Sequence, residues 1–284
     1  MQKLVRTDYF VACLTILVAG LLVWQSSWFV AIDHKIYDLA MNLSAQTASD
    51  KVAVIAIDEQ SIASLGPWPW PRTIHAHLNQ RLAAAGAKVI GQTSFVSEPQ
   101  IDPGMAYINR IQALHGAASK TFADAGLKQL PAEYVQIGSV LDEARLALNP
   151  DAIFAVSLAK AGNVILPMYV ELGTSPALPE QPLPAYLQRT RLDPSVNGLL
   201  QAQRASFPLT SLGQAASGVG VLLQIPDAVD GILRCEPLAF RYLEQVYPSV
   251  ALMLAARSLG LQPGDIRITP ERGELTLEIG RAHV

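Results

Sequence analysis

The chain has 284 residues, of which 50% are hydrophobic and 16% are charged, and its formal net charge is −3. This composition excludes a disordered or collagen-like chain, and the lack of any basic run argues against nucleic acid as a partner. Because an average soluble domain is roughly 25% charged, the low charge indicates a membrane segment on an otherwise folded chain. Its two cysteines, Cys13 and Cys235, form neither a zinc pattern nor a disulfide framework.

The N-terminal region carries Lys3 and Arg6 and then has no charged residue from position 9 to position 32. Residues 9–24 are apolar and would make a helix of about 24 Å. Continued to residue 30, that helix covers the roughly 30 Å hydrocarbon core of a bilayer. We therefore predict a transmembrane helix over residues 9–30.

The charges on either side of this stretch predict its orientation. Basic residues precede it and Asp33 and Asp38 follow it, which places residues 1–8 in the cytoplasm. The remainder is then expected in the periplasm, anchored to the inner membrane by one span. A cleaved signal peptide is the alternative, but no A-x-A cleavage site follows the apolar stretch.

The rest of the chain alternates between helical and strand patterns. Residues 33–49 predict an amphipathic helix. Residues 51–57 (KVAVIAI) predict a strand buried on both faces, and with a helix at 73–85 and a strand at 88–90 they form a βαβ unit. Further predicted elements are helices at 104–148 (two pieces, an inserted hairpin), 151–161 and 248–259, and strands at 164–166, 219–223, 232–241, 266–269 and 274–277. The expected fold class is α/β, with a mixed, partly parallel sheet flanked by helices and an N-terminal transmembrane helix.

Catalytic patterns are scarce. Ser157 and Lys160 match the SxxK spacing of serine acyl-enzymes, but the companion SDN and KTG motifs are missing. His75 and His77 are two residues apart on a helix and point in different directions, so we expect no shared metal. We therefore expect no catalytic residues, no metal and no cofactor.

The segment 66–72, Gly-Pro-Trp-Pro-Trp-Pro-Arg, is the most distinctive in the chain. It follows Asp58, which ends the predicted strand, and it leads into the next helix. Because ligands of open α/β sheets bind beyond the carboxyl ends of parallel strands, Asp58, Trp68, Trp70 and Arg72 are candidate ligand-binding residues. The alternative is an internal Asp–Arg ion pair that fixes the turn over a tryptophan corner.

A second candidate lies at residues 226–234, Pro-Asp-Ala-Val-Asp-Gly-Ile-Leu-Arg. A turn around Gly231 would hold an acid and an arginine close together. Asp230 and Arg234 are therefore also candidate ligand-binding residues.

With these motifs the sequence resembles the second class of CHASE domains, extracytoplasmic sensory modules of bacterial membrane receptors. The resemblance spans about residues 33–280. It rests on Ile57-Asp58-Glu59-Gln60-Ser61, residues 65–72, His75-Ala76, residues 82–90, Phe95-Val-Ser-Glu-Pro99, residues 161–167, Asp230-Gly-Ile-Leu-Arg234 and residues 248–252. The family usually has an aspartate in the strand before Ser-Glu-Pro, where this chain has Gly91-Gln-Thr93-Ser94, so no role is carried over for that carboxylate.

The resemblance implies a signal-input domain over residues 33–277, without catalysis, in a receptor whose cytoplasmic output is a kinase or a cyclase. Its expected partners are a small-molecule or envelope signal, the membrane and a second copy of the chain. Residues 278–284 look like a translated sequencing adapter, which predicts a fragment cut before its output. An anchored extracytoplasmic enzyme and a ligand-free dimerisation module are the alternatives.

Overall fold

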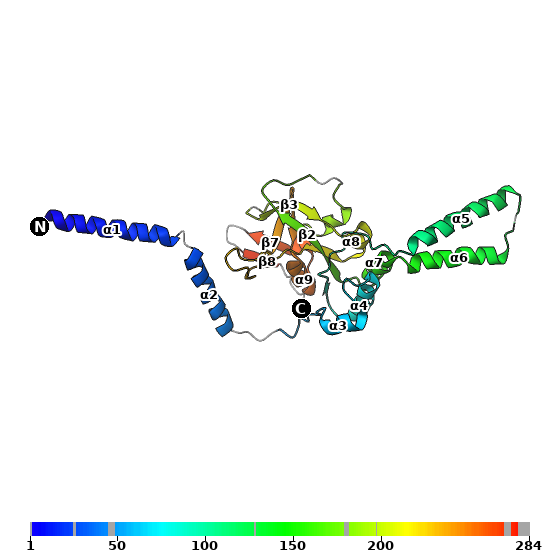
Figure 1. The fold of residues 1–284 in the computed structure, drawn as a ribbon, viewed down its shortest axis with the longest axis horizontal. Helices are drawn as coiled ribbons and strands as arrows, with labels where there is room; N and C mark the ends of the chain where they lie inside the picture. Colours follow the sequence, from blue (N-terminus) through cyan, green and yellow to red (C-terminus); the bar gives the residue numbers. More distant parts are fainter. Residues whose placement is uncertain are drawn as a thin grey trace, which may run out of the picture. The chain divides into compact units, whose positions relative to one another are not determined.

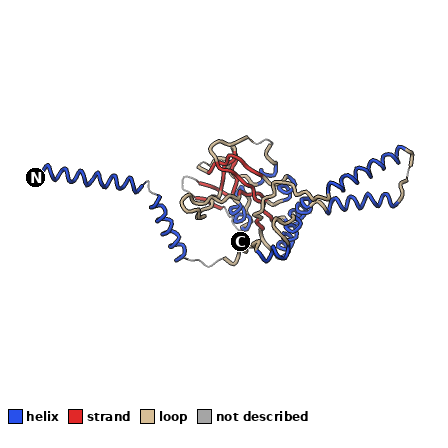
Figure 2. The backbone as a smooth tube through the Cα atoms, in the orientation of Figure 1, coloured by secondary structure: helices blue, strands red, loops and turns tan. Residues whose placement is uncertain are grey.

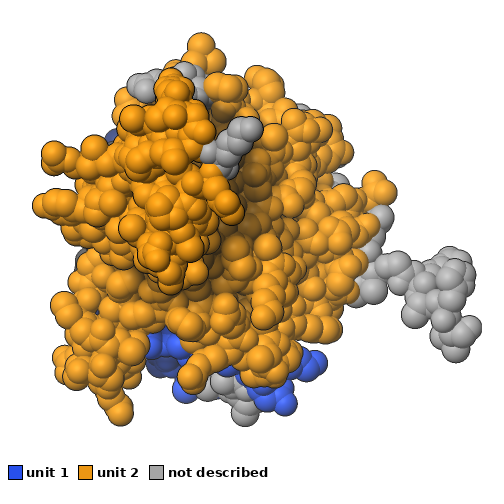
Figure 3. Space-filling model, turned by 90° about the vertical axis from the view of Figure 1, so that its right-hand side faces the viewer, with its two compact units in different colours: residues 1–57, 224–236 blue, residues 58–223, 237–284 orange. Residues whose placement is uncertain are grey.

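The computed structural model describes residues 2–24, 27–44, 49–127, 129–178, 182–196, 198–269 and 274–277. The chain divides into two compact units, coloured separately in Figure 3. Unit 1 comprises Met1–Ile57 and Gln224–Glu236, and unit 2 comprises Asp58–Leu223 and Pro237–Val284. The predicted adapter tail, 278–284, lies outside the described residues.

Unit 1 begins with two helices, α1 (Gln2–Trp24) and α2 (Ser27–Leu43). Among the described residues, no helix combines the length and the apolar character that crossing a bilayer demands. The predicted transmembrane helix over 9–30 is therefore wrong, and the single-span topology drawn from it is unsupported. The prediction assumed one helix that continues to residue 30. Because α1 ends at Trp24, its apolar stretch is shorter than the roughly 20 residues that a spanning helix needs.

The segment 51–57 is a second correction. Its β-branched residues favour a strand, but residues 52–57 form neither helix nor strand and pair with no strand among the described residues. Val52 is 71% and Val54 87% exposed, so the predicted buried strand, and the βαβ unit built on it, do not form. A strand pattern favours an extended conformation, whereas the pairing that makes a strand depends on distant residues.

Unit 2 contains the strands, drawn in red in Figure 2. They are β1 (Ile90–Gly91), β2 (Val164–Leu172), β3 (Leu200–Ser206), β4 (Gly218–Val221), β5 (Ala239–Tyr242), β6 (Gln245–Pro248), β7 (Ile266–Thr269) and β8 (Glu274–Leu277). The main sheet has the order β1-β2-β3-β5-β6, with β4 also paired to β2, and β7 and β8 form a separate hairpin.

β2 organises the main sheet. Its first half pairs in parallel with β1 and β4, and its second half pairs antiparallel with β3. The remaining pairs are β3 with β5, parallel, and β5 with β6, antiparallel. The prediction of a mixed, partly parallel sheet is thus confirmed, and the buried side chains of β2 form the centre of the core: Val164, Ile165, Leu166, Met168 and Val170.

The helices of unit 2 are α3 (Glu59–Leu65), α4 (Arg72–Ala84), α5 (Met105–Asp124), α6 (Ala132–Ala147), α7 (Pro150–Ala161), α8 (Thr210–Ala215) and α9 (Val250–Ser258), with 3-10 turns at Ala185–Arg189 and Pro263–Asp265. α9 contacts β1, β2 and β4, and α4 contacts α7 and β1. At Gly220 a Cβ atom would lie 2.8 Å from the Val250 backbone, so glycine allows β4 and α9 to approach closely.

Local signals located several of these helices correctly. Asn149 accepts a hydrogen bond from the Ala152 amide at 3.0 Å and caps α7, which ends at Gly162 in a left-handed conformation. Within the stretch 104–148, where an inserted hairpin was predicted, the structure has the two helices α5 and α6, which extend away from the strands of unit 2 (Figure 1). The strand predicted at 232–241 is shorter, because only Ala239–Tyr242 pairs with a neighbour.

Candidate functional site

The aromatic segment before α4 forms one wall of a cavity in unit 2. Trp68 and Trp70 pack edge to face with ring centroids 5.6 Å apart. The indole N–H of Trp70 donates to the Gly66 carbonyl at 2.8 Å, and this side of the turn is thereby fixed. Trp70 is buried, whereas Trp68 is 43% exposed.

The cavity has a volume of about 240 Å³. Its lining comes from the turn before α4, the start of α4, the segment that follows β1, and α7. The lining residues are Trp68, Pro69, Trp70, Arg72, His75, Gln92, Ser94, Phe95, Val96, Pro99, Gln100 and Phe154. A small pocket with mostly apolar walls and a few polar groups is typical of a small-molecule site.

Arg72 is held by groups of the protein itself. Its guanidinium donates to the Asp151 carboxylate and to the Glu98 carbonyl, and its backbone N–H donates to Gln100 Oε1 at 2.7 Å. The Arg72 and Asp151 side chains are only 11% and 15% exposed. An internal Asp–Arg pair therefore exists at this corner, and its acid is Asp151.

His75 and Gln92 complete the lining. The His75 ring lies edge-on to Trp68 at 5.7 Å between centroids. Burial, and secondarily the positive charge of Arg72, lower the pKa of His75, so its imidazole is uncharged at neutral pH. Gln92 follows β1 directly, and its Nε2 donates to the buried Asn79 Oδ1 at 3.0 Å.

The structure brings together only part of the predicted site. Trp68, Trp70 and Arg72 line the cavity. Asp58 instead caps α3: its carboxylate accepts from the Ser61 amide at 2.8 Å and the Ser61 hydroxyl at 2.6 Å, and these bonds lower its pKa. Asp58 is not a lining residue of the cavity.

Other lining residues were not recognised as such from the sequence. The motif at residues 95–99, quoted above for the family resemblance, was an available signal for Phe95 and Pro99. No comparable signal existed for Phe154 or for Asp151, which lies 79 residues from its partner Arg72.

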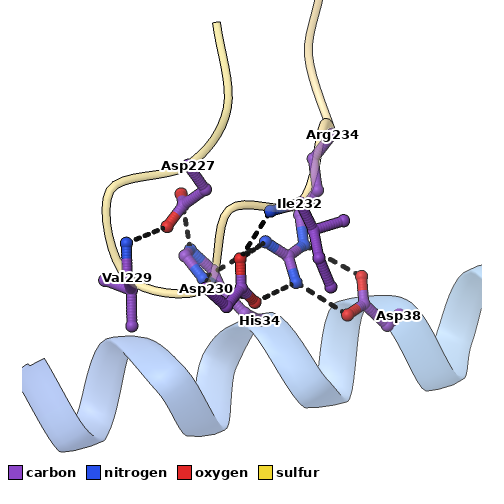
Figure 4. Close-up of polar contacts among 7 residues, drawn as sticks. All are labelled: His34, Asp38, Asp227, Val229, Asp230, Ile232 and Arg234. Carbon is purple, nitrogen blue, oxygen red and sulfur yellow. Dashed lines mark hydrogen bonds and ion pairs between the residues drawn. The ribbon is translucent and has the colours of Figure 1, made fainter.

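Asp230 and Arg234 belong to unit 1, where they form a polar cluster of their own (Figure 4). Arg234 donates to both oxygens of Asp230, at 2.9 and 2.6 Å, and to both oxygens of Asp38 on α2, at 2.9 and 2.7 Å. The prediction that this turn holds an acid next to an arginine is confirmed. The bonds to Arg234 lower the pKa of Asp230 to about 2 and raise the pKa of Arg234 itself.

The same cluster contains a set of metal-ligating side chains. One ligand atom each from His34, Asp227 and Asp230 lie within 4.8 Å of one another. Arg234 already donates to both carboxylate oxygens of Asp230, however, so a cation would compete with a two-fold ion pair. The geometry therefore favours a structural role, in which the cluster ties the loop 224–236 to α2.

Comparison with known protein families identifies the chain. The model of the CHASE2 domain matches residues 13–282, nearly the whole length. No curated protein and no solved structure gives a match. The resemblance read from the motifs is thus confirmed, and the chain belongs to the CHASE2 family of extracytoplasmic sensory domains.

Proposed function

We propose that this chain is the sensory input of a bacterial membrane receptor and that its small-molecule ligand binds in the cavity beside Trp68. The responding output would be a cytoplasmic kinase or cyclase, carried outside the segment described above. Membership of a sensory family supports the general role. The position of the cavity supports the place of binding.

That position is the observation that carries the proposal. β1 pairs in parallel with β2 and ends at Gly91, and the next residue, Gln92, already lines the cavity together with the segment up to Gln100. The cavity therefore opens at the carboxyl end of a parallel strand, where open α/β sheets bind their ligands. The tryptophan turn before α4 also lines the cavity.

A thermal-shift screen of the full chain against small envelope metabolites tests the proposal. We expect compounds that raise the melting temperature of the wild type to lose that effect in Trp68→Ala. Tyr107→Ala is the matched control, because Tyr107 is an aromatic residue of α5 that is 71% exposed and is not a lining residue. Compounds that stabilise Trp68→Ala as strongly as the control would place binding elsewhere.

A further inference from the structure

We infer that the cavity beside Trp68 selects an uncharged, planar molecule of one or two rings that carries both a hydrogen-bond donor and an acceptor. This inference rests on the function proposed above and specifies what the cavity binds. It follows from the charge, the ring surfaces and the free polar atoms of the lining.

The lining carries no net charge. Arg72 and His75 are the titratable side chains among the lining residues. Arg72 is neutralised by Asp151, and burial keeps the imidazole of His75 uncharged at neutral pH. A charged ligand would lose its hydration here and gain no counter-charge, which is costly in a half-buried site.

The walls are aromatic. His75 lies between two further rings, at 5.7 Å from Trp68 and 6.3 Å from Phe154, measured between centroids. Phe95, another lining residue, packs edge to face with Tyr169 at 5.8 Å between ring centroids. Ring edges and faces in fixed orientations favour a flat partner that stacks or packs edge to face, and a volume of about 240 Å³ admits one or two rings.

Two amides leave hydrogen-bonding capacity at the cavity. Gln92 uses Nε2 for Asn79, and its Oε1 accepts no hydrogen bond from the residues that the structure describes. Gln100 uses Oε1 for the Arg72 amide, and its Nε2 donates to no described residue. These two amides thus leave an acceptor and a donor, and the hydroxyl of Ser94, also in the lining and without a hydrogen bond to a described residue, can act as either. Such a lining matches a ligand that carries both a donor and an acceptor, such as a primary carboxamide.

A series of isosteres that differ in charge tests the inference on the full chain. Benzamide, benzoate and benzamidine share a ring and a shape but are neutral, negative and positive at pH 7.5. Indole-3-carboxamide and indole-3-carboxylate repeat the comparison with two rings. Saturation-transfer NMR titrations measure Kd for each compound with the wild type, Trp68→Ala and the control Tyr107→Ala.

We expect each amide to bind at least tenfold more tightly than its charged isosteres, and Trp68→Ala but not Tyr107→Ala to lose this binding. Equal or tighter binding of a charged isostere that is still lost in Trp68→Ala would overturn the inference and leave the proposed function standing. No binding by any compound would overturn the inference, whereas the proposed function would still be decided by the thermal-shift screen. Binding that Trp68→Ala does not change would overturn the inference and place these compounds outside the proposed site. The comparison within the wild type holds even if Trp68→Ala does not fold.

Discussion

Arg72 and Asp151 form an ion pair that is almost removed from water, and such pairs are most sensitive to the loss of one partner. Arg72→Met leaves the Asp151 carboxylate, only 15% exposed, without its counter-charge. We expect this to lower the free energy of unfolding by about 3 kcal/mol, measured by urea denaturation of the full chain. Adding Asp151→Leu should restore a large part of that loss.

Arg110→Met is the control for this experiment. Arg110 is exposed on α5 and makes no ion pair with a described residue, so its replacement should change stability by less than about 0.5 kcal/mol. If Arg72→Met is as stable as Arg110→Met, the pair contributes nothing to the fold. The corner itself was predictable from the prolines and tryptophans, but Asp151 was not, because only the folded sheet and helices bring α7 to α4.

His75 makes stability depend on pH. Its pKa is lowered from 6.5 in the folded protein, so below pH 6.5 the unfolded chain takes up a proton more readily than the folded one. The contribution of His75 is therefore present above pH 6.5 and is lost as the pH falls through its lowered folded-state value. We expect the wild type to lose more stability between pH 7.5 and 5 than His75→Gln, measured by urea denaturation.

His77→Gln is the matched control, since His77 is exposed on the same helix. Its pH profile should follow that of the wild type. Identical profiles for all three proteins would show that His75 titrates as it does in the unfolded chain.

At the scale of single elements, local sequence signals predicted helix ends correctly, whereas the pairing of strands was predicted less well. Helix α7 was predictable because Asn149 and Gly162 sit at its ends and act through neighbouring residues. The strand β3 and the short helix α8 were missed, because Leu200–Ser206 alternates only weakly and Thr210–Ala215 is too short to show a period. The segment 51–57 was predicted to pair and does not, since apolar β-branched residues favour extension without specifying a partner.

The α5–α6 hairpin is the part of the chain whose deletion we expect the fold to tolerate best. Its helices hold each other through His115, which stacks on Tyr134 at 4.1 Å, and Phe122, which packs edge-on to the same ring at 5.3 Å. α5 buries no residue, and α6 buries Leu141 alone. The two ends of the hairpin lie together, since a Cβ atom on Gly104 would be 3.5 Å from Leu148.

We therefore expect a chain in which residues 105–147 are replaced by a short Gly-Ser linker to fold. Loss of one buried leucine should cost about 2 kcal/mol at most, measured by urea denaturation, and benzamide should bind as it does to the wild type. A deletion variant that lacks a cooperative unfolding transition would show instead that the hairpin belongs to the folding unit.

At the scale of the whole molecule, unit 1 is assembled from segments far apart in sequence. Arg234 donates hydrogen bonds to Asp38, 196 residues away in sequence, and no local sequence pattern predicts such a pair. Trypsin cleaves after arginine, and a guanidinium held by Asp38 and Asp230 is a poor substrate. We expect Asp38→Asn to speed tryptic cleavage after Arg234 several-fold, followed by mass spectrometry of the full chain.

Asp33→Asn is the control, because Asp33 is exposed on the same helix and makes no hydrogen bond with a described residue. It removes the same charge and should leave the cleavage rate unchanged. Equal rates in both variants would mean that the Arg234–Asp38 pair does not hold the loop 224–236.

The exposed segment 51–57 has a consequence for the protein in concentrated solution. Residues 52–57, Val-Ala-Val-Ile-Ala-Ile, carry no charge, proline or glycine, are exposed, and pair with no strand among the described residues. Such segments form stacked cross-β fibrils. We expect the purified chain at high concentration to form fibrils that bind thioflavin T, and Val54→Lys to prevent this. Leu178→Lys is the control, because Leu178 is 86% exposed in a proline-rich loop, and it should form fibrils as the wild type does. If Val54→Lys forms fibrils as fast as the wild type, another part of the chain causes the aggregation. If the wild type forms no fibrils, crystallisation and NMR experiments do not need this substitution.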